Sequence, residues 1–236
     1  IYVFNNLNVA SIERSINELS SKIADAQILM LVGGFSSGDE PDGSGKFIAS
    51  VLKNPKVNTA IQTLLKNDGL ILGICNGFQA LIKSGLLPYG DIEKLNEASP
   101  TLFRNDINRH VSHIAYTRVA SNKSPWLSSF KPGKQHSVAM SHGEGKFVCD
   151  EETAKKLFEN GQVATQYVDL DGDPTMNGRY NLNGSTLAIE GITSEDGRIL
   201  GKMGHCERYE DGLFQNIEGD KLQSIIENGV NYFKKK

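Results

Sequence analysis

The stretch that decides the fold prediction is Gly69-Leu70-Ile71-Leu72-Gly73-Ile74-Cys75-Asn76-Gly77. It opens as a continuous apolar run, which is typical of a strand buried on both faces of a parallel sheet. Residues 78–84 follow with a helical pattern that closes at Gly85. Glycines on either side of Cys75 let the backbone turn sharply between strand and helix. The stretch therefore predicts a strand–turn–helix unit with Cys75 at the turn.

Strands and helices alternate on either side of this unit. A second apolar run, 27–32, ends at Gly33-Gly34, and helical patterns occupy 11–19 and 47–67. This alternation predicts an α/β fold with a mostly parallel central sheet flanked by helices. Further strands are expected at 1–4, 100–120, 134–148, 163–168, 181–192 and 198–203, and further helices at 151–160 and 220–233. Without repeats or a linker, residues 1–236 are expected to form a single domain.

The composition excludes several classes of protein. The 236 residues are 39% hydrophobic and 22% charged, as in globular rather than disordered proteins. The sequence has no apolar run of about 18 residues to span a membrane, and its net charge of −3 argues against a nucleic-acid partner. Three cysteines make a disulfide framework improbable, so we expect a cytoplasmic location. Because the chain starts at Ile1 rather than Met, we expect a C-terminal piece of a longer polypeptide.

Cys75 is the candidate nucleophile. A glycine-flanked residue between a buried strand and a helix has the arrangement of the nucleophile elbow of hydrolases, with Cys in place of Ser. The helix N-terminus favours the reactive thiolate, and the backbone N–H of Asn76 points toward an oxyanion on the substrate. Gly34, which follows the neighbouring strand, is a candidate for the second N–H donor. The alternative is an inert cysteine, since cysteine is among the residues most often buried.

A cysteine nucleophile needs a base, and His205 is the best candidate among the five histidines. It follows an apolar strand and lies two residues before Glu207, and in an extended segment such residues point to the same side. Glu207 can then hold the Nδ1 proton of His205. A His-x-Glu pair alone is more often a surface feature, so this assignment depends on the Cys75 turn. His142 is a plausible ligand contact, and the Cys and His spacings predict no metal site.

Three motifs in order carry a resemblance to a known family. They are Gly33-Gly34-Phe35-Ser36 with Gly38-Asp39, Gly73-Ile74-Cys75-Asn76-Gly77-Phe78-Gln79, and Gly204-His205-Cys206-Glu207-Arg208. Together they resemble the class I (triad) glutamine amidotransferases across nearly the whole chain. Ser141–Phe147, Tyr167 and Asn177-Gly178 make the chain look more narrowly like the glutaminase domains of phosphoribosylformylglycinamidine synthases.

The resemblance implies a flavodoxin-like sheet and a role for each of several residues. The roles are Cys75 as nucleophile, His205 as general base and acid, Glu207 as its orienting carboxylate, Gly34 and Asn76 as oxyanion donors, and Gln79 and His142 as weaker candidates for holding glutamine. The chain lacks the strand that opens the family pattern. We therefore expect an unpaired edge in the sheet.

The activity that the resemblance implies is glutamine hydrolysis through a thioester on Cys75. The ammonia would serve the ATP-dependent conversion of formylglycinamide ribonucleotide to formylglycinamidine ribonucleotide in purine biosynthesis. No cofactor is expected in this chain. ATP and Mg would bind the synthetase part, which is the expected partner, and Gly43-Ser44-Gly45-Lys46 lacks the Ser or Thr that a phosphate loop needs next. Two alternatives are a stand-alone cysteine hydrolase of γ-glutamyl or related amides, and a non-catalytic docking domain.

Overall fold

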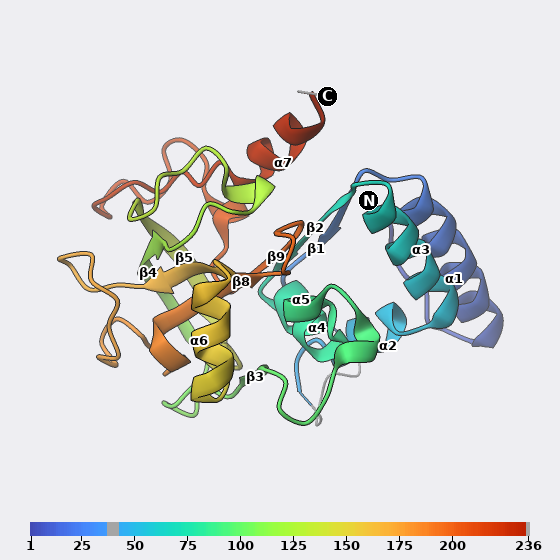
Figure 1. Ribbon diagram of the computed structural model, residues 1–236, viewed down its shortest axis with the longest axis horizontal. Helices are drawn as coiled ribbons and strands as arrows, with labels where there is room; N and C mark the ends of the chain where they lie inside the picture. The colour runs from blue at the N-terminus through green and yellow to red at the C-terminus, as the bar shows by residue number, and fades with distance from the viewer. Residues whose placement is uncertain (37–42, 235–236) are drawn as a thin grey trace.

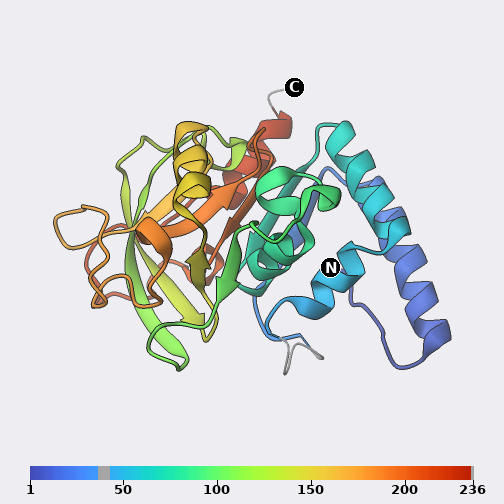
Figure 2. The same ribbon diagram turned by 60° about the horizontal axis from the view of Figure 1, so that its bottom comes forward.

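The computed structural model describes residues 1–36 and 43–234, which form a central sheet with helices packed around it (Figures 1 and 2). The sheet has the strand order β1-β2-β9-β8-β7-β4-β5. Its strands are β1 (Ile28–Leu31), β2 (Leu70–Ile74), β4 (Val111–Val119), β5 (Gln135–His142), β7 (Val163–Tyr167), β8 (Ile189–Thr193) and β9 (Ile199–Lys202). A separate antiparallel ribbon joins β3 (Thr101–Phe103) to β6 (Lys146–Val148).

Helices cover the sheet and connect its strands. The α-helices are α1 (Val9–Ala24), α2 (Lys46–Leu52), α3 (Pro55–Lys66), α4 (Asn76–Ser84), α5 (Leu86–Tyr89), α6 (Glu151–Glu159) and α7 (Ile225–Lys234). Short 3-10 turns are η1 (Ile92–Lys94), η2 (Pro125–Leu127), η3 (Thr186–Ala188) and η4 (Cys206–Arg208). In both ribbon views α1 and α3 lie side by side at the β1 end of the molecule, while α6 lies with the strands of the second half (Figures 1 and 2).

The predicted α/β fold is confirmed, but the sheet is mixed rather than mostly parallel. Parallel pairing joins β1 to β2 and β2 to β9. The remaining pairs, from β9 through β8, β7 and β4 to β5, are antiparallel. Parallel strands need a long crossover connection, which the helices between β1 and β2 supply. Three of the antiparallel pairs, β4–β5, β7–β8 and β8–β9, join consecutive strands of this sheet through loops and short turns.

The N-terminal strand expected at 1–4 is absent, because this segment lies along α1 instead. The Tyr2 hydroxyl donates to the Ser15 carbonyl oxygen (2.9 Å), and the Asn5 N–H donates to the Ser15 hydroxyl (2.9 Å). β1 is consequently an edge strand, and among the described residues no strand pairs with its outer side. It is therefore half-buried rather than buried on both faces, with Met30 39% exposed.

Polar residues at the helix starts explain where several helices begin. The side chain of Asn8 accepts from the Ser11 N–H (2.9 Å) ahead of α1, and that of Asp150 accepts from the Thr153 N–H (2.7 Å) ahead of α6. Such caps satisfy N–H groups that have no partner inside the helix. α3 starts with Pro55, whose missing N–H costs nothing at the first helical position.

The main core surrounds the unit that decided the fold prediction. Every residue of β2 is buried, and Phe78 and Leu81 on α4 join it in the main apolar cluster. α4 lies against the end of β1 through Gly77, where an added Cβ would collide with the backbone carbonyl of Leu31. The helix can approach the strand this closely only because that residue has no side chain.

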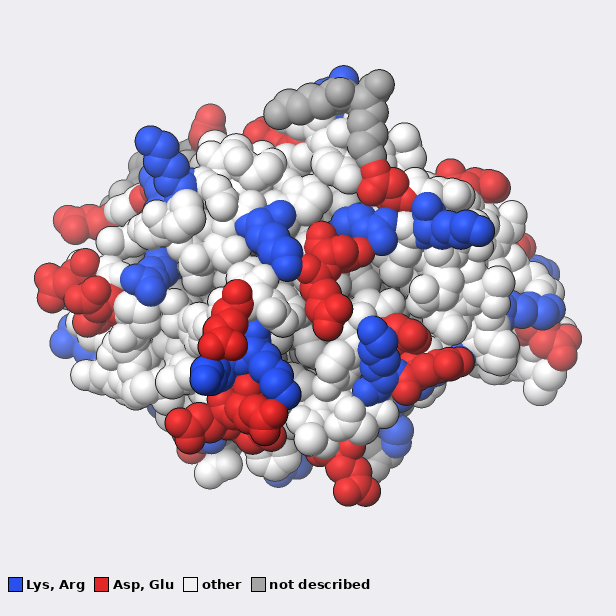
Figure 3. Space-filling model, in the orientation of Figure 1, with Lys and Arg blue, Asp and Glu red and all other residues white. Residues whose placement is uncertain are grey.

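Charge and helix length add two observations. On the face drawn in Figure 3, acidic and basic side chains are interspersed and do not gather into one basic patch. Within residues 1–36 and 43–234, no helix has the length and apolarity needed to cross a membrane.

Gly77→Ala is expected to lower the free energy of unfolding by about 1–3 kcal/mol, the usual cost of overpacking. Alanine is normally more stable than glycine in a helix. A loss of stability on this change would therefore come from the collision with Leu31. Denaturant unfolding monitored by circular dichroism measures the change. Gly178→Ala is the matched control, because nothing lies within 4 Å of an added Cβ there. Equal stability of the two variants would contradict the close approach.

Candidate active site

Cys75 occupies a strained turn between β2 and α4. Its φ is 52° and its ψ is −107°, a conformation that costs energy for a residue with a side chain. The Cys75 N–H donates to the Lys202 carbonyl oxygen on β9 (2.9 Å), and the Cys75 carbonyl accepts from the Gln79 N–H in α4 (3.0 Å). An added Cβ at Gly73 would lie 2.8 Å from the Gly77 carbonyl oxygen, so the turn also needs glycine there.

Burial and hydrogen bonding act in opposite directions on the Cys75 thiol. Only 5% of the residue is exposed, and this burial raises the pKa of the thiol above its ordinary value. Backbone N–H donation from Asn76 and Gly34, together with the positive charge of Arg208, lowers the same pKa but does not outweigh burial. The expected preference for the thiolate is therefore overridden at rest. The thiol donates to the Ser141 carbonyl oxygen (3.6 Å).

The two candidate oxyanion donors both lie at the sulfur. Asn76 is the first residue of α4, and Gly34 follows β1, so the two N–H groups come from the ends of neighbouring parallel strands. Gly34 has a φ of 134°, which a residue with a side chain rarely adopts. The two N–H groups are hydrogen-bonded to the sulfur, so they lie close to where the oxygen of an attached acyl carbon would stand, and they remain the candidate oxyanion donors.

His205 and Glu207 form the predicted pair. The Nδ1 atom of His205 lies 2.6 Å from Oε1 of Glu207, and His205 is 2% exposed. Although burial raises the pKa of Glu207, the hydrogen bond from His205 and its own backbone N–H bring the net pKa below its usual value. Glu207 is thus ionised and accepts the Nδ1 proton. Nε2 of His205 is buried and has no hydrogen-bond partner among the described residues.

The local geometry of this pair differs from the expectation. His205 and Glu207 were expected in an extended segment, but Cys206–Arg208 form η4, and His205 is the residue that precedes it. The tight turn brings the carboxylate back to the imidazole. The His205 N–H donates to the Ala139 carbonyl oxygen on β5 (2.8 Å), which fixes the start of the turn.

Gly33 is the point where the three sequence motifs meet. An added Cβ there would lie 3.2 Å from Cβ of Cys75 and 3.3 Å from Nδ1 of His205. The cysteine and the imidazole are therefore neighbours across this glycine. Gly38 and Asp39, which belong to the first motif, lie outside the described residues.

His142 is also part of the site. Asn105, which the sequence analysis did not single out, determines which ring nitrogen of His142 carries the proton. The Asn105 side-chain amide donates to the carbonyls of Arg109 (3.1 Å) and His142 (2.9 Å), so its Oδ1 is the acceptor. Oδ1 accepts from the Gly145 N–H (3.1 Å) and lies 3.2 Å from Nδ1 of His142. Nδ1 therefore carries the proton, and Nε2 is a buried lone pair without a partner among the described residues.

Burial lowers the pKa of His142 to about 4, so the ring is neutral near pH 7.

Gln79 has a different part in the site. Its side-chain N–H₂ donates to the Glu144 carbonyl oxygen (2.5 Å), and the Glu144 carboxylate accepts from the Ser44 N–H (2.8 Å). Gln79 thereby joins α4 to the turn after β5 and forms a wall of the site.

A cavity of about 30 Å³ lies at the sulfur. This is enough room for about two water molecules. Its lining comprises Gly34, Phe35, Ser44, Cys75, Gln79, Ser141, His142, Gly143 and Arg208. Phe35 and Arg208 belong to the motifs quoted from the sequence. Ser44 belongs to the glycine-rich stretch 43–46, which the sequence analysis rejected as a phosphate loop and did not assign to the site.

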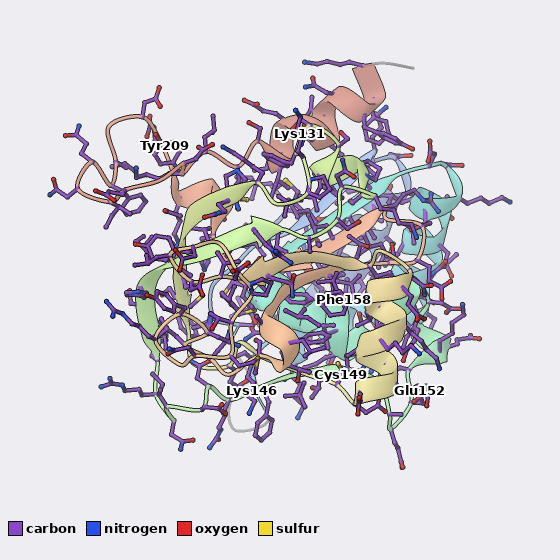
Figure 4. All side chains as sticks on the ribbon, turned by 60° about the vertical axis from the view of Figure 1, so that its left-hand side comes forward. Lys131, Lys146, Cys149, Glu152, Phe158 and Tyr209 are labelled. Carbon is purple, nitrogen blue, oxygen red and sulfur yellow. The ribbon has the colours of Figure 1, made fainter. Side chains whose placement is uncertain are left out.

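The other two cysteines differ from Cys75 in their surroundings. Burial raises the pKa of Cys149 to about 11 and that of Cys206 to about 11, so neither is a reactive thiolate near neutral pH. Figure 4 shows Cys149 near the start of α6 and Tyr209 in the loop that follows η4. Across the part of the chain that the structure describes, no group of three or more His, Cys, Asp or Glu residues is placed to hold a metal ion.

Comparison with known proteins places this arrangement in a family. The model of the CobB/CobQ-like glutamine amidotransferase domain matches residues 3–235. The phosphoribosylformylglycinamidine synthase subunit PurQ of Methanococcus maripaludis is 37% identical over an alignment that covers 93% of this chain and 84% of that protein.

Solved structures agree on the fold. A chain in the structure of PurLQS from Thermotoga maritima superposes with a TM-score of 0.65 at 27% identity, covering 89% of this chain and 81% of that chain. The glutaminase domain of Trypanosoma brucei CTPS, solved with bound acivicin, has a TM-score of 0.55 at 14% identity and covers 98% of this chain and 80% of that one. The second likeness concerns the fold alone.

Alkylation of Cys75 by iodoacetamide is expected to rise with pH through an inflection above about 8.5, the ordinary thiol pKa. Only the thiolate reacts, and burial favours the neutral thiol. The rate at each pH is measured by mapping the peptide that contains Cys75. The same chain in denaturant is the control and should titrate at the ordinary value. An inflection in the folded chain at or below that of the control would contradict the assigned direction.

Proposed function

The chain belongs to the family of CobB/CobQ-like glutamine amidotransferase domains, and from this membership we propose that it hydrolyses the side-chain amide of glutamine. The ammonia is used to convert formylglycinamide ribonucleotide to formylglycinamidine ribonucleotide in purine biosynthesis. The observation that carries the chemistry is the buried Cys75 sulfur facing two backbone N–H groups, with the His205–Glu207 pair next to it. The likeness to PurQ supports the choice of acceptor.

The first half-reaction forms a thioester. Nε2 of His205 takes the thiol proton as the Cys75 sulfur attacks the amide carbon of glutamine. The negative charge that develops on the amide oxygen is stabilised by the N–H groups of Gly34 and Asn76. Glu207 holds the opposite ring nitrogen and stabilises the imidazolium. His205 then gives the proton to the departing nitrogen, which leaves as ammonia.

The second half-reaction releases glutamate. A water molecule gives a proton to Nε2 of His205 and attacks the carbonyl carbon of the γ-glutamyl thioester. The same oxyanion donors stabilise the second tetrahedral intermediate. Its collapse returns the proton to the Cys75 sulfur and frees the carboxylate product. Splitting amide hydrolysis into two acyl transfers replaces one difficult step with two easier ones.

His142 and Gln79 supply the binding wall. The neutral ring of His142 presents a lone pair at Nε2, so it accepts a hydrogen bond from an N–H group of glutamine. A buried acceptor without a partner costs free energy, and the substrate removes that cost when it binds. Gln79 acts less directly, because its amide already holds the backbone of Glu144.

The site leaves the remaining chemistry to a partner. We infer that residues 1–236 act as one glutaminase domain and that a synthetase part, as a separate subunit or in the same polypeptide, binds ATP and Mg. The naming of the relative as a synthase subunit supports this division. Three free thiols and a biosynthetic reaction favour the cytoplasm as the location.

The two alternatives explain less. A stand-alone hydrolase of other amides does not account for a synthase subunit as a relative over 93% of the chain. A docking domain without activity has no use for a strained cysteine with two N–H donors and an oriented imidazole, since such strain persists only where the surrounding structure maintains it.

Cys75→Ala is expected to abolish glutamine-dependent synthesis by the complete synthase and to leave ammonia-dependent synthesis unchanged, because only the nucleophile is lost. Product formation is measured with each nitrogen source. The matched control is Cys206→Ala, which removes the buried thiol directly before Glu207 in η4 without touching the nucleophile. Glutamine-dependent synthesis that survives Cys75→Ala would contradict the proposed function.

The chain without its synthetase partner is expected to hydrolyse glutamine slowly. The cavity of about 30 Å³ at the sulfur is small for the carboxamide of glutamine, so we expect its walls to separate when the substrate binds. If the open form is a minor state of roughly 0.1–10%, turnover at limiting substrate falls by about 10- to 1000-fold relative to the complex. Ammonia release is measured with and without the partner. Equal kcat/KM in the two states would contradict the prediction.

A further inference from the structure

A buried ion pair lies behind the active site, and the mechanism above does not use it. Glu190 on β8 and Lys202 at the end of β9 have fully buried side chains, with Nζ 3.4 Å from Oε1. The two strands are antiparallel neighbours, and Lys202 pairs with Gly191, the residue after Glu190. Taking two charges out of water is costly unless both are paired and hydrogen-bonded. Their presence therefore needs a structural reason.

Both members of the pair hydrogen-bond to the main chain of one residue, Gly204. The Gly204 N–H donates to Oε1 of Glu190 (2.5 Å), and Nζ of Lys202 donates to the Gly204 carbonyl oxygen (2.8 Å). An added Cβ at Gly204 would lie 2.9 Å from that Nζ and 3.0 Å from that Oε1. Both hydrogen bonds involve an ionised group, and such bonds are stronger and shorter than neutral ones.

Further hydrogen bonds within the sheet hold Glu190. The Thr165 hydroxyl on β7 donates to Oε2 of Glu190, and the backbone carbonyl of Glu190 accepts from the Met203 N–H (3.3 Å). Three neighbouring strands thus hold the two charges in place. Gly204 is gripped by a rigid part of the sheet rather than by a loop.

Gly204 directly precedes His205, and Lys202 also contacts the nucleophile. The backbone carbonyl of Lys202 accepts the Cys75 N–H (2.9 Å), while its side chain holds the carbonyl before His205. One residue therefore fixes the main chain of both reacting partners. Glycine has the freest backbone of any residue. Without these two hydrogen bonds, Gly204 would therefore be the least constrained part of the chain between β9 and the imidazole of His205.

We propose that Glu190 and Lys202 are a positioning pair, which holds the main chain at Gly204 so that His205 stays in register with Cys75. The inference rests on the proposed function of those two residues. Its physical basis is the sensitivity of proton transfer to geometry, because a displacement of about 1 Å can cost on the order of 10²-fold in rate. The pair carries no net charge, so it orders the imidazole without adding a field of one sign.

The experiment removes both charges together, since removing one leaves the other buried and unpaired. Glu190→Gln/Lys202→Met is made in the complete synthase, and glutamine hydrolysis is measured. We expect kcat to fall by about 10- to 100-fold with KM for glutamine within about twofold. Gln162→Met is the matched control, because it removes a buried amide that bridges Pro88 and Thr193, at the other end of β8. Its kcat should stay close to that of the native protein.

The distinguishing measurement repeats the change in a His205→Ala background. If the pair acts through His205, removing the charges there should alter the residual kcat by less than about twofold, since residues that act as a unit are not additive. An equal fold-loss with and without His205 would overturn the proposal and indicate a general structural role. A native kcat in the charge-free variant would overturn it as well.

A second variant keeps the inference testable if the charge-free chain does not fold. Gly204→Ala retains both charges but pushes a methyl group between them, and we expect the same loss of kcat with little change in KM. A native kcat for Gly204→Ala would overturn the proposal. If the native synthase released no ammonia from glutamine, the proposed function would fail. If the native synthase is active and the variants match its kcat, only the positioning role of Glu190 and Lys202 is refuted.

Discussion

The structure depends on the close approach of backbone to backbone where β2 turns into α4. Cys75 keeps its positive φ only because β9 holds its N–H, α4 holds its carbonyl, and glycines on both sides leave no side chain in the way. The same approach brings the end of β1 against α4, which places the N–H of Gly34 beside that of Asn76. The oxyanion donors and the nucleophile are thus consequences of one packing arrangement.

Burial gives this site its particular electrostatic balance. A low-dielectric surrounding strengthens each N–H donor, but it also raises the pKa of the thiol and keeps it neutral at rest. Reactivity then depends on a base that can take the proton when the substrate arrives. His205 has its outer nitrogen free among the described residues and its inner nitrogen bound to an ionised carboxylate. The cysteine therefore needs its imidazole more than an exposed thiolate would.

The sequence predicted the features that depend on short spacings. The strand–turn–helix unit, the cysteine at its turn and the position of His205 two residues before Glu207 all follow from local pattern, and the structure brings them together. The antiparallel half of the sheet did not follow, because pairing β4 with β5 and β7 depends on contacts between distant segments. Asn105 was missed for the same reason, since it lies in an irregular stretch and contacts the site 37 residues away. The hydrogen bonds to Gly204 were missed as well, because they come from Glu190 on β8 and Lys202 on β9, and only the pairing of these strands brings the two side chains together.

One feature of β5 has a consequence for how this chain matures. Its outer edge supplies the carbonyl of Ala139 to His205 and the carbonyl of Ser141 to Cys75, although β5 stands at the opposite end of the strand order from β1. The curled sheet must close before these two bonds can form. A partly folded chain in which only the parallel strands have paired brings His205 near Cys75 through β9, but it lacks the two β5 carbonyls that hold the turn at His205 and the thiol in place. Full chemical competence is thereby reserved for molecules that have completed their tertiary structure.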